Sequence, residues 1–196
     1  MQLIQRRSDN KHSEFALGYL KGKIGQAIVE TYLIEADYEI YPFGYETSYA
    51  NSTRFVKQDY LDTTTTKIRC MPDLLVCDKT NNERYLLEIK TTSAPDESRY
   101  WIQKESLDSY KKYWPEAILV VYCILTGNIR CSKIADIKDL TEGLLPNTTK
   151  AGYYLNLTDF QNMTTYFRRI EPHPYDELRN KIAKTITDCG GVGEGR

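Results

Sequence analysis

Hydrophobic residues near the start of the chain recur at intervals of three and four, which is the spacing of one face of a helix. These residues are Ile24, Ala27, Ile28 and Ile34. The pattern predicts a helix over residues 14–36. We expect the polar segment that precedes it, residues 6–12, to be weakly ordered.

Three runs rich in β-branched and aromatic residues follow, and each predicts a strand. The runs span residues 38–43, 67–78 and 83–90, with a long loop over residues 44–66 after the first. Residues 79–82 have the sequence Lys-Thr-Asn-Asn, which is typical of a turn between two strands. The last two runs are therefore expected to form a hairpin.

The second half of the chain begins with an amphipathic pattern over residues 98–114, which predicts a helix that ends before Pro115. Residues 117–125 are continuously apolar, as expected for a buried central strand. After this strand the pattern is weaker. It predicts a short helix near residues 134–140, a strand over 153–157, a helix over 175–188 and a disordered, glycine-rich tail from about residue 190.

The order of these elements is helix, three strands, helix, strand. Such an order predicts an α/β or α+β fold in which helices flank a sheet. The length of 196 residues suits a single domain. We assign residues 1–128 to the core and residues 129–196 to a C-terminal extension that packs on it.

Composition narrows the class of protein. A formal net charge of −1 means that any contact with nucleic acid must come from a local basic patch rather than from bulk charge. No apolar run approaches the ~20 residues of a transmembrane helix, and the first residues lack the apolar stretch of a signal peptide. The five cysteines include no CxxC pair, which favours reduced structural thiols over a disulfide framework or a zinc ribbon. We therefore expect a cytoplasmic protein, or one of the host cytoplasm if a phage or mobile element encodes it.

The predicted hairpin carries two acids and a lysine. Glu88 and Lys90 are two residues apart on one strand and therefore share a face. If residues 79–82 form the turn, Asp73 lies opposite Glu88, with Cβ atoms about 4.5–5.5 Å apart. Two carboxylates that close repel each other unless they are neutralised, and a divalent cation such as Mg²⁺ or Mn²⁺ would do so. The alternative is a surface strand with a Glu–Lys salt bridge, but the apolar residues around these positions indicate buried strands.

A third carboxylate, Glu30, lies within the apolar stripe of the first predicted helix. Its neighbours on that face are Ala27 and Ile34. Such a glutamate stands either at the edge of the core or near a functional site. Glu35 and Glu39 are competing candidates, and both are expected to be more exposed.

These residues together resemble the motif of the PD-(D/E)XK nuclease superfamily, with the spacing found in archaeal Holliday-junction resolvases and restriction-type endonucleases. The matching residues are Gly25, Glu30, Pro72, Asp73, Glu88, Ile89 and Lys90. The resemblance covers about residues 14–126. It implies a restriction-endonuclease-like αβββαβ core with a central mixed sheet flanked by helices.

The resemblance also implies a chemistry and a role for each residue. Asp73 and Glu88 would bind Mg²⁺, for which Mn²⁺ could substitute, and Glu30 would complete the metal shell directly or through water. Lys90 would orient or activate the attacking water. The implied activity is that of a Mg²⁺-dependent DNA endonuclease, with RNA left open as a substrate. Since cutting two strands calls for two active sites, analogy with the family also suggests a homodimer.

Two alternatives remain open. One is a RecB-like exonuclease that acts with a recombination or repair partner. Members of that branch carry the motif Gln-x-x-x-Tyr after the lysine. Here the fourth residue after Gln103 is Leu107, and Tyr110 lies further on, so the motif is imperfect. The four clustered cysteines of its iron–sulfur members are absent, so no Fe–S cluster is expected. The other alternative is a nucleic-acid-binding subunit without catalytic activity.

Contacts to the substrate are expected from cationic, amide and aromatic side chains near the motif. The candidates are Lys23, Lys67, Arg69, Gln103 and Tyr110. Each could equally be an ordinary residue of a solvated helix face or, for the tyrosine, of the core. The predicted loop over residues 44–66 is a further candidate, because loops of that length in compact domains are often functional.

Overall fold

The computed structural model describes residues 2–44, 62–94, 98–144, 149–167, 169–170 and 184, with the side chains of the first helix described from residue 16 onward. Its centre is a six-stranded sheet in the order β1-β2-β3-β5-β6-β9. The pair β3–β5 is parallel and the other neighbouring pairs are antiparallel, so the sheet is mixed. Its strands are β1 (Tyr38–Pro42), β2 (Leu74–Asp78), β3 (Arg84–Thr92), β5 (Ile118–Cys123), β6 (Ile129–Lys133) and β9 (Gln161–Asn162).

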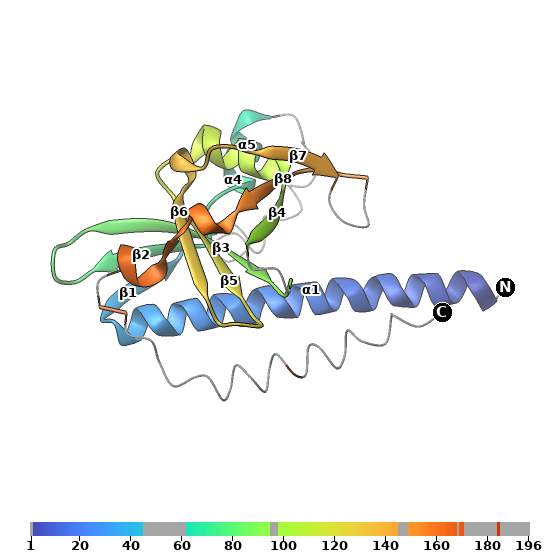
Figure 1. Cartoon of the computed structure of the whole chain (residues 1–196), viewed down its shortest axis with the longest axis horizontal. Coiled ribbons are helices and arrows are strands. Elements are labelled where there is room, and N and C mark those ends of the chain that lie inside the picture. Colours follow the sequence, from blue (N-terminus) through green and yellow to red (C-terminus); the bar gives the residue numbers. More distant parts are fainter. Residues whose placement is uncertain are drawn as a thin grey trace.

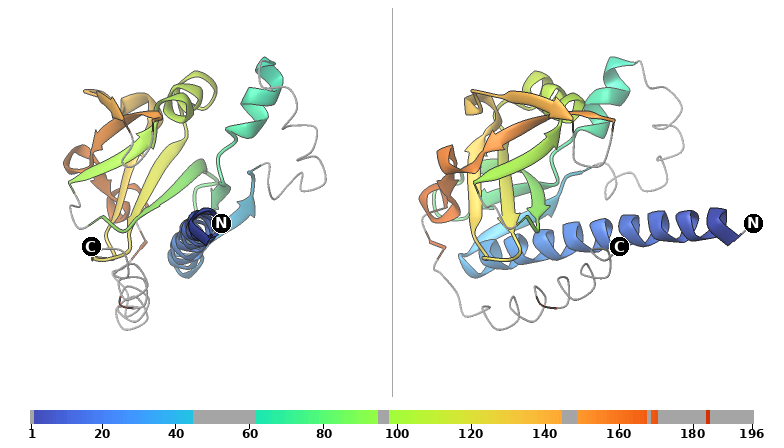
Figure 2. Two further views of the ribbon diagram at one scale, coloured as in Figure 1. Left: turned by 90° about the vertical axis from the view of Figure 1, so that its right-hand side faces the viewer. Right: turned by 45° about the vertical axis from the view of Figure 1, so that its right-hand side comes forward.

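Helices cover both faces of this sheet, as Figures 1 and 2 show. Helix α1 (Gln2–Glu35) packs on one face through Val29 and Leu33, which join the core formed with β2, β3 and β5. Helix α5 (Lys104–Tyr113) lies on the other face, where Leu107 and Tyr110 are buried. The N-terminal half of α1 extends well beyond the sheets (Figure 1). The predicted mixed sheet flanked by helices is confirmed.

A second sheet packs on the α5 side. It has the order β4-β8-β7 and consists of β4 (Arg99–Gln103), β8 (Ala151–Asn156) and β7 (Thr141–Leu144). Both neighbouring pairs are antiparallel. Ile102 and Leu155 from this sheet are buried together with Leu119 and Val121 of the central strand β5, so the two sheets share one core.

The hairpin prediction is confirmed in register as well as in place. Leu74 pairs with Leu87, and Cys77 pairs with Arg84. The turn over residues 79–82 is closed by the amide of Asp78, which donates to the carbonyl of Glu83 at 2.8 Å. Because the pairing is antiparallel and regular, the position just before Leu74 falls opposite Glu88 on β3.

The segment around residue 65 differs from its prediction. Instead of a loop over residues 44–66 and a strand from residue 67, the chain forms α4 (Thr63–Arg69). The side chain of Asp62 accepts a hydrogen bond from the Thr65 amide at 2.9 Å, and such an N-cap stabilises the first turn of a helix. The four threonines at residues 63–66 were assigned to the end of the loop, because threonine has a low helix propensity. Residues 45–61 lie outside the described part of the chain.

The predicted helix over residues 98–114 was too long. Its first part is β4, and α5 begins only at Lys104. The Tyr100-Trp101-Ile102 run has high β-propensity, and pairing with β8 determines its conformation. In contrast, α1 is longer than predicted and includes residues 6–12. This segment contains good helix formers such as Arg and Lys.

The chain after residue 128 contributes to both sheets. β6 and β9 extend the main sheet, so the predicted boundary between residues 128 and 129 falls between two adjacent strands, β5 and β6. The predicted helix near residues 134–140 is reduced to the 3₁₀ turn η2 (Ile134–Asp136), and the predicted strand over 153–157 is β8. A second 3₁₀ turn, η3 (Leu157–Asp159), and the short helix α6 (Met163–Tyr166) follow. The predicted helix over 175–188 and the glycine-rich tail lie outside the described residues, apart from residue 184.

Among the described helices, none combines the length and apolar character that crossing a membrane requires.

Candidate active site

Glu88 is the buried acid of the central sheet. It lies on β3, next to the parallel strand β5, and its side chain points toward α5. Only 2% of its surface is exposed, so the carboxylate is removed from water almost entirely. Buried charges of this kind are costly unless they are paired, and they are therefore often functional.

Two donors hold one oxygen of this carboxylate. The Oε1 atom of Glu88 lies 2.5 Å from Lys90 Nζ, and it accepts a hydrogen bond from the hydroxyl of Tyr110 at 2.5 Å. Lys90 comes from the same strand face, whereas Tyr110 reaches across from α5. The Lys90 ammonium also lies 5.9 Å from the centre of the Tyr110 ring. The three side chains thus form one compact cluster.

Asp73 lies beside this cluster. Its Oδ2 accepts a hydrogen bond from the backbone amide of Ile89 at 2.8 Å, which ties the residue just before β2 to the middle of β3. The hairpin register places Asp73 directly opposite Glu88. Its negative charge is close enough to Glu88 to raise the pKa of that carboxyl.

The electrostatics of the cluster follow from burial. Burial is the main reason that the pKa of Glu88 rises from 4.5 to about 7, and Lys90 opposes the shift. Burial by itself would lower the pKa of Lys90, but the facing Glu88, Tyr110 and Tyr100 outweigh it and hold that pKa well above its ordinary value. Lys90 is therefore a permanent cation, and Glu88 gains or loses its proton near neutral pH.

The oxygens of Asp73 and Glu88 are suitable ligands for a hard divalent cation. Mg²⁺ is usually bound by one or two carboxylates that leave the remaining positions to water and substrate phosphate. The described part of the chain brings no three His, Cys, Asp or Glu side chains together as a metal-binding group. Asp73 and Glu88 thus supply two carboxylates, within the number that Mg²⁺ usually takes from a protein.

Glu30, the third predicted ligand, lies on α1. It accepts a hydrogen bond from Gln26 Nε2 at 2.8 Å. Its neighbour Val29 packs on the sheet face that carries Leu87 and Ile89, opposite to the face that carries Glu88. A role for Glu30 in the metal shell stays a prediction.

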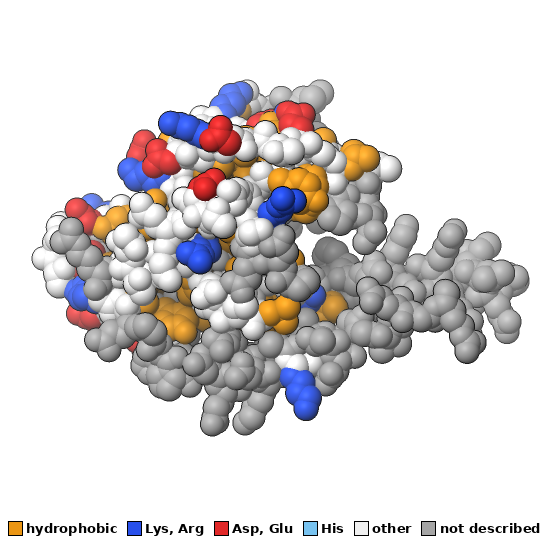
Figure 3. All heavy atoms as spheres, viewed as in Figure 1, with side chains coloured by type: hydrophobic (Ala, Val, Ile, Leu, Met, Phe, Trp, Pro, Cys, Tyr) orange, Lys and Arg blue, Asp and Glu red, His pale blue; other side chains and the backbone are white. Residues whose placement is uncertain are grey.

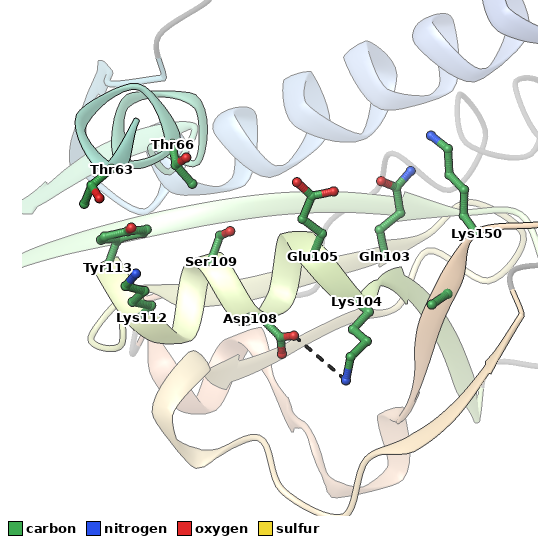
Figure 4. Close-up of a pocket in the computed structure, with 11 residues that line it drawn as sticks. Thr63, Thr66, Gln103, Lys104, Glu105, Asp108, Ser109, Lys112, Tyr113 and Lys150 are labelled. Carbon is green, nitrogen blue, oxygen red and sulfur yellow. Dashed lines mark ion pairs between the residues drawn. The ribbon is translucent and has the colours of Figure 1, made fainter. Parts of the chain in front are cut away.

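A groove lies between α4 and α5. It has a volume of about 710 Å³. We call it the α4–α5 groove, and Figure 4 shows the residues that line it: Thr63, Thr66, Gln103, Lys104, Glu105, Asp108, Ser109, Lys112, Tyr113, Lys150 and Ala151. A smaller hollow of about 150 Å³ shares Thr66, Gln103, Glu105 and Ser109 with it. The hollow continues to Tyr110, the residue that holds Glu88.

The predicted substrate contacts occupy different places. Gln103 lines both the groove and the hollow, and Arg69 and Tyr110 line the hollow. Lys67 instead lies 5.6 Å from the ring of Trp114, beside the C-terminal end of α5. Lys23 is on α1, where it donates to Gln26 at 3.4 Å. Three of the five candidates thus line the groove or the hollow, and a role in substrate binding stays a prediction for all five.

Sequence reasoning missed part of the site. Tyr110 was expected to contact substrate, yet its hydroxyl holds Glu88. Tyr100 on β4 is not among the predicted site residues, although burial raises its pKa and it interacts electrostatically with both Lys90 and Glu88. The available signal was helical spacing, because Leu107 and Tyr110 are three residues apart and share the face of α5 that packs on the sheet.

Comparison with known proteins finds similarity at the level of structure. No protein-family profile matches the sequence, and no curated protein matches it. Among solved structures, one described as a nuclease from a fusselovirus aligns with 85% of this chain and 97% of its own length, at 12% sequence identity and a TM-score of 0.45. At this level of similarity, a functional assignment depends on the side chains of the site.

Proposed function

We propose that this protein is a metal-dependent nuclease that hydrolyses phosphodiester bonds in DNA, and that it cuts as an endonuclease. The observation that carries the proposal is the buried Glu88, with Lys90 and Tyr110 on one oxygen and Asp73 opposite in the hairpin. A structural ion pair at the surface would need neither the burial nor the second acid. This cluster instead combines two acids, a fixed cation and an adjoining groove.

Asp73 and Glu88 would hold the metal ion, which we propose to be Mg²⁺ with Mn²⁺ as a substitute. A divalent cation bound there would stabilise charge on the phosphate and lower the pKa of a bound water. The two carboxylates come from neighbouring strands, and the Ile89 amide fixes the Asp73 side chain. The backbone therefore sets their separation, which favours a preorganised site.

Lys90 would act as a fixed positive charge and hydrogen-bond donor. Its raised pKa keeps it protonated at neutral pH, so it is poorly suited to remove a proton. About 31% of its side chain is exposed, which leaves the ammonium access to a ligand beside Glu88. We therefore assign it to orienting the attacking water and stabilising developing negative charge, rather than to general base catalysis.

The proposal is tested by measuring cleavage of a DNA panel. The panel contains single-stranded, duplex, flapped and four-way-junction DNA, each with Mg²⁺, Mn²⁺ or EDTA. We expect cleavage with either metal and none with EDTA. Glu88→Gln and Lys90→Ala should each lower the rate by about 10²-fold or more, because preorganised charge stabilisation is commonly worth that much.

Glu116→Gln is the matched control, since this carboxylate is exposed and pairs with Lys133 away from the cluster. It should cleave like the wild type. Closed circular DNA distinguishes an endonuclease from an exonuclease. An endonuclease cuts it, whereas an exonuclease needs a free end and does not. Binding without cleavage in every metal would instead identify a non-catalytic binding subunit and overturn the proposal.

A further inference from the structure

The α4–α5 groove lies beside the candidate active site. It shares Gln103, Glu105, Ser109 and Thr66 with the smaller hollow, and Tyr110 also lines the hollow. The Tyr110 hydroxyl is in turn 2.5 Å from Glu88. A chain-like ligand that extends from the groove into the hollow would therefore reach Tyr110, the residue that holds Glu88.

The side chains that face the groove are mostly neutral hydrogen-bonding groups. In Figure 4, Glu105 and Ser109 of α5 and Gln103 at the end of β4 point to the side of α5 on which the threonines of α4 lie. The charged pair Lys104 and Asp108 turns to the other side of α5, and Lys104 is further neutralised by Glu142 of β7. The groove thus offers hydroxyl, amide and carboxylate groups, with Lys112 and Lys150 as its remaining cations.

Such neutral and acidic side chains are poorly suited to bind the phosphate backbone of a DNA duplex. Double-stranded DNA carries one negative charge about every 1.7 Å of its axis, and proteins hold it chiefly with Lys and Arg. The groove has three lysines against two acids. On the face shown in Figure 3, basic and acidic side chains of the described residues are interspersed and do not form a single basic patch.

The same groups do suit the exposed edges of unpaired bases. Amide, hydroxyl and carboxylate side chains hydrogen-bond base edges, and a carboxylate accepts from an exocyclic amino group while it repels phosphate. Tyr113 adds an aromatic ring with the Lys112 ammonium 4.9 Å from its centre, a combination that can stack a base and contact the strand. Glu105 is the most informative residue, because it favours a base over a phosphate.

We propose that the α4–α5 groove binds an unpaired stretch of a nucleic-acid strand by its bases and delivers that strand to the Asp73–Glu88 site. The inference rests on the proposed function, and it narrows the substrate to DNA or RNA that is single-stranded or locally unpaired next to the cut. Duplex without such a stretch cannot present its base edges to the groove.

The experiment measures binding with a protein that carries Glu88→Gln and has an intact groove. The probes are fluorescent oligonucleotides of one mixed sequence, as single-stranded DNA, single-stranded RNA and duplex DNA, in EDTA. We expect at least one single strand to bind about tenfold or more tightly than the duplex. Adding Ser109→Trp, which fills the groove, should weaken that binding by about tenfold or more, the loss that one base contact can produce.

Two further variants sharpen the test. Thr165→Trp adds the same bulk at an exposed position of α6, outside the groove, and should leave binding unchanged. Glu105→Lys shows whether the bases or the phosphates of the strand face this position. The added positive charge should weaken binding if bases lie there and strengthen it if phosphates do. Circular dichroism checks that each variant is folded.

Equal binding of duplex and single strand, no effect of Ser109→Trp, or tighter binding by Glu105→Lys would each overturn the inference. Failure of the proposed function has a different signature. If wild-type protein cuts nothing with Mg²⁺ or Mn²⁺ but the groove variants still control strand binding, the groove assignment stands and the nuclease assignment fails. If it cuts duplex and Ser109→Trp cuts equally well, the nuclease assignment stands and the groove assignment fails.

Discussion

Tyr110 on α5 donates its hydroxyl to the same oxygen of Glu88 that Lys90 contacts, although 22 residues separate the tyrosine from the glutamate. One helix and one strand therefore converge on a single carboxylate oxygen. This arrangement fixes the direction of the carboxylate, because each donor restricts its rotation. It also means that α5, which lines the groove, is coupled to the acid at the candidate active site.

Tyr110→Phe should lower the cleavage rate while the protein stays folded. The variant removes only the hydroxyl, and hydrogen bonds to charged groups are worth about 1.5–3 kcal/mol, so we expect a loss of about tenfold to a hundredfold. The rate is measured against Mg²⁺ concentration. If Tyr110 positions Glu88 for the metal, half-saturation moves to higher Mg²⁺.

Tyr113→Phe is the matched control for this variant. It also removes a hydroxyl from α5, but at the groove rather than at Glu88. It should leave the Mg²⁺ dependence unchanged. Equal Mg²⁺ half-saturation in Tyr110→Phe and wild type would show that the hydroxyl has no positioning role.

Glu88 should make the metal-free protein less stable as the pH rises through neutrality. Burial raises its pKa from 4.5 to about 7, so the folded state holds the proton more tightly than the unfolded chain does. This contribution to stability is complete below pH 4.5 and is lost as the pH passes 7. The slope for one such group is at most about 1.4 kcal/mol per pH unit.

Urea unfolding in EDTA at several values between about pH 4.5 and 8 measures this effect. The free energy of unfolding of wild type minus that of Glu88→Gln should fall across the range, because glutamine does not titrate. Glu116→Gln, which removes an exposed carboxylate away from the cluster, is the control for the Glu-to-Gln change itself. A pH-independent difference for Glu88→Gln would contradict the raised pKa.

The core of the site could be predicted because it depends on local geometry. A four-residue turn fixes an antiparallel register, and that register alone places Asp73 opposite Glu88. Side chains alternate between the two faces of β3, so Lys90 lies on the same face as Glu88. Helical spacing places Tyr110 on the buried face of α5, but it does not predict the contact with Glu88, because that contact depends on how α5 packs on the sheet.

The parts of the fold that were mispredicted are those decided by partners distant in sequence. Residues 99–103 form a strand because β8, some fifty residues later, pairs with them. Residues 63–69 form a helix because Asp62 caps it and Trp114 packs beside it, with its indole nitrogen donating to the Lys67 carbonyl at 3.4 Å. The buried strand β5 was predicted well, because its composition reflects burial on both faces.

Gly25→Ala should destabilise the protein. A Cβ atom at this position would overlap Thr91 Oγ1 and lie 3.0 Å from Thr91 Cβ, so α1 would have to move away from β3. Such overpacking typically costs about 1–3 kcal/mol. Gly22→Ala is the control: a Cβ atom there would have no neighbour within 4 Å, so the substitution should stabilise the helix by up to about 1 kcal/mol.

A second substitution tests the cause of the Gly25→Ala effect. Thr91→Ala removes the hydroxyl and methyl groups that the new Cβ would meet, and the Thr91 hydroxyl is buried without a hydrogen-bond partner among the described residues. Combined with Gly25→Ala, it should restore part of the lost stability in urea unfolding. Additive effects of the two substitutions would mean that the helix and the strand do not clash at this point.

Arg169 should contribute to stability by joining the chain after α6 to the edge of the main sheet. Its guanidinium lies 2.7 Å from Asp78 Oδ1 and 4.7 Å from the centre of the Tyr38 ring. Asp78 is largely buried, so Arg169→Met leaves a carboxylate with one fewer partner and should lower the melting temperature. Lys138→Met is the control at an exposed lysine, and it should leave the melting temperature unchanged.

The pH dependence distinguishes this ion pair from simple packing. Hydrogen bonds from Thr80, together with Arg169, lower the pKa of Asp78 from its ordinary value of 3.8. A lowered pKa stabilises the fold above pH 3.8, and the contribution is lost as the pH falls below that value. The difference in melting temperature between wild type and Arg169→Met should therefore be larger at about pH 7 than at about pH 3. An equal difference at both values would indicate that Arg169 acts through its contact with Tyr38 and not through its charge.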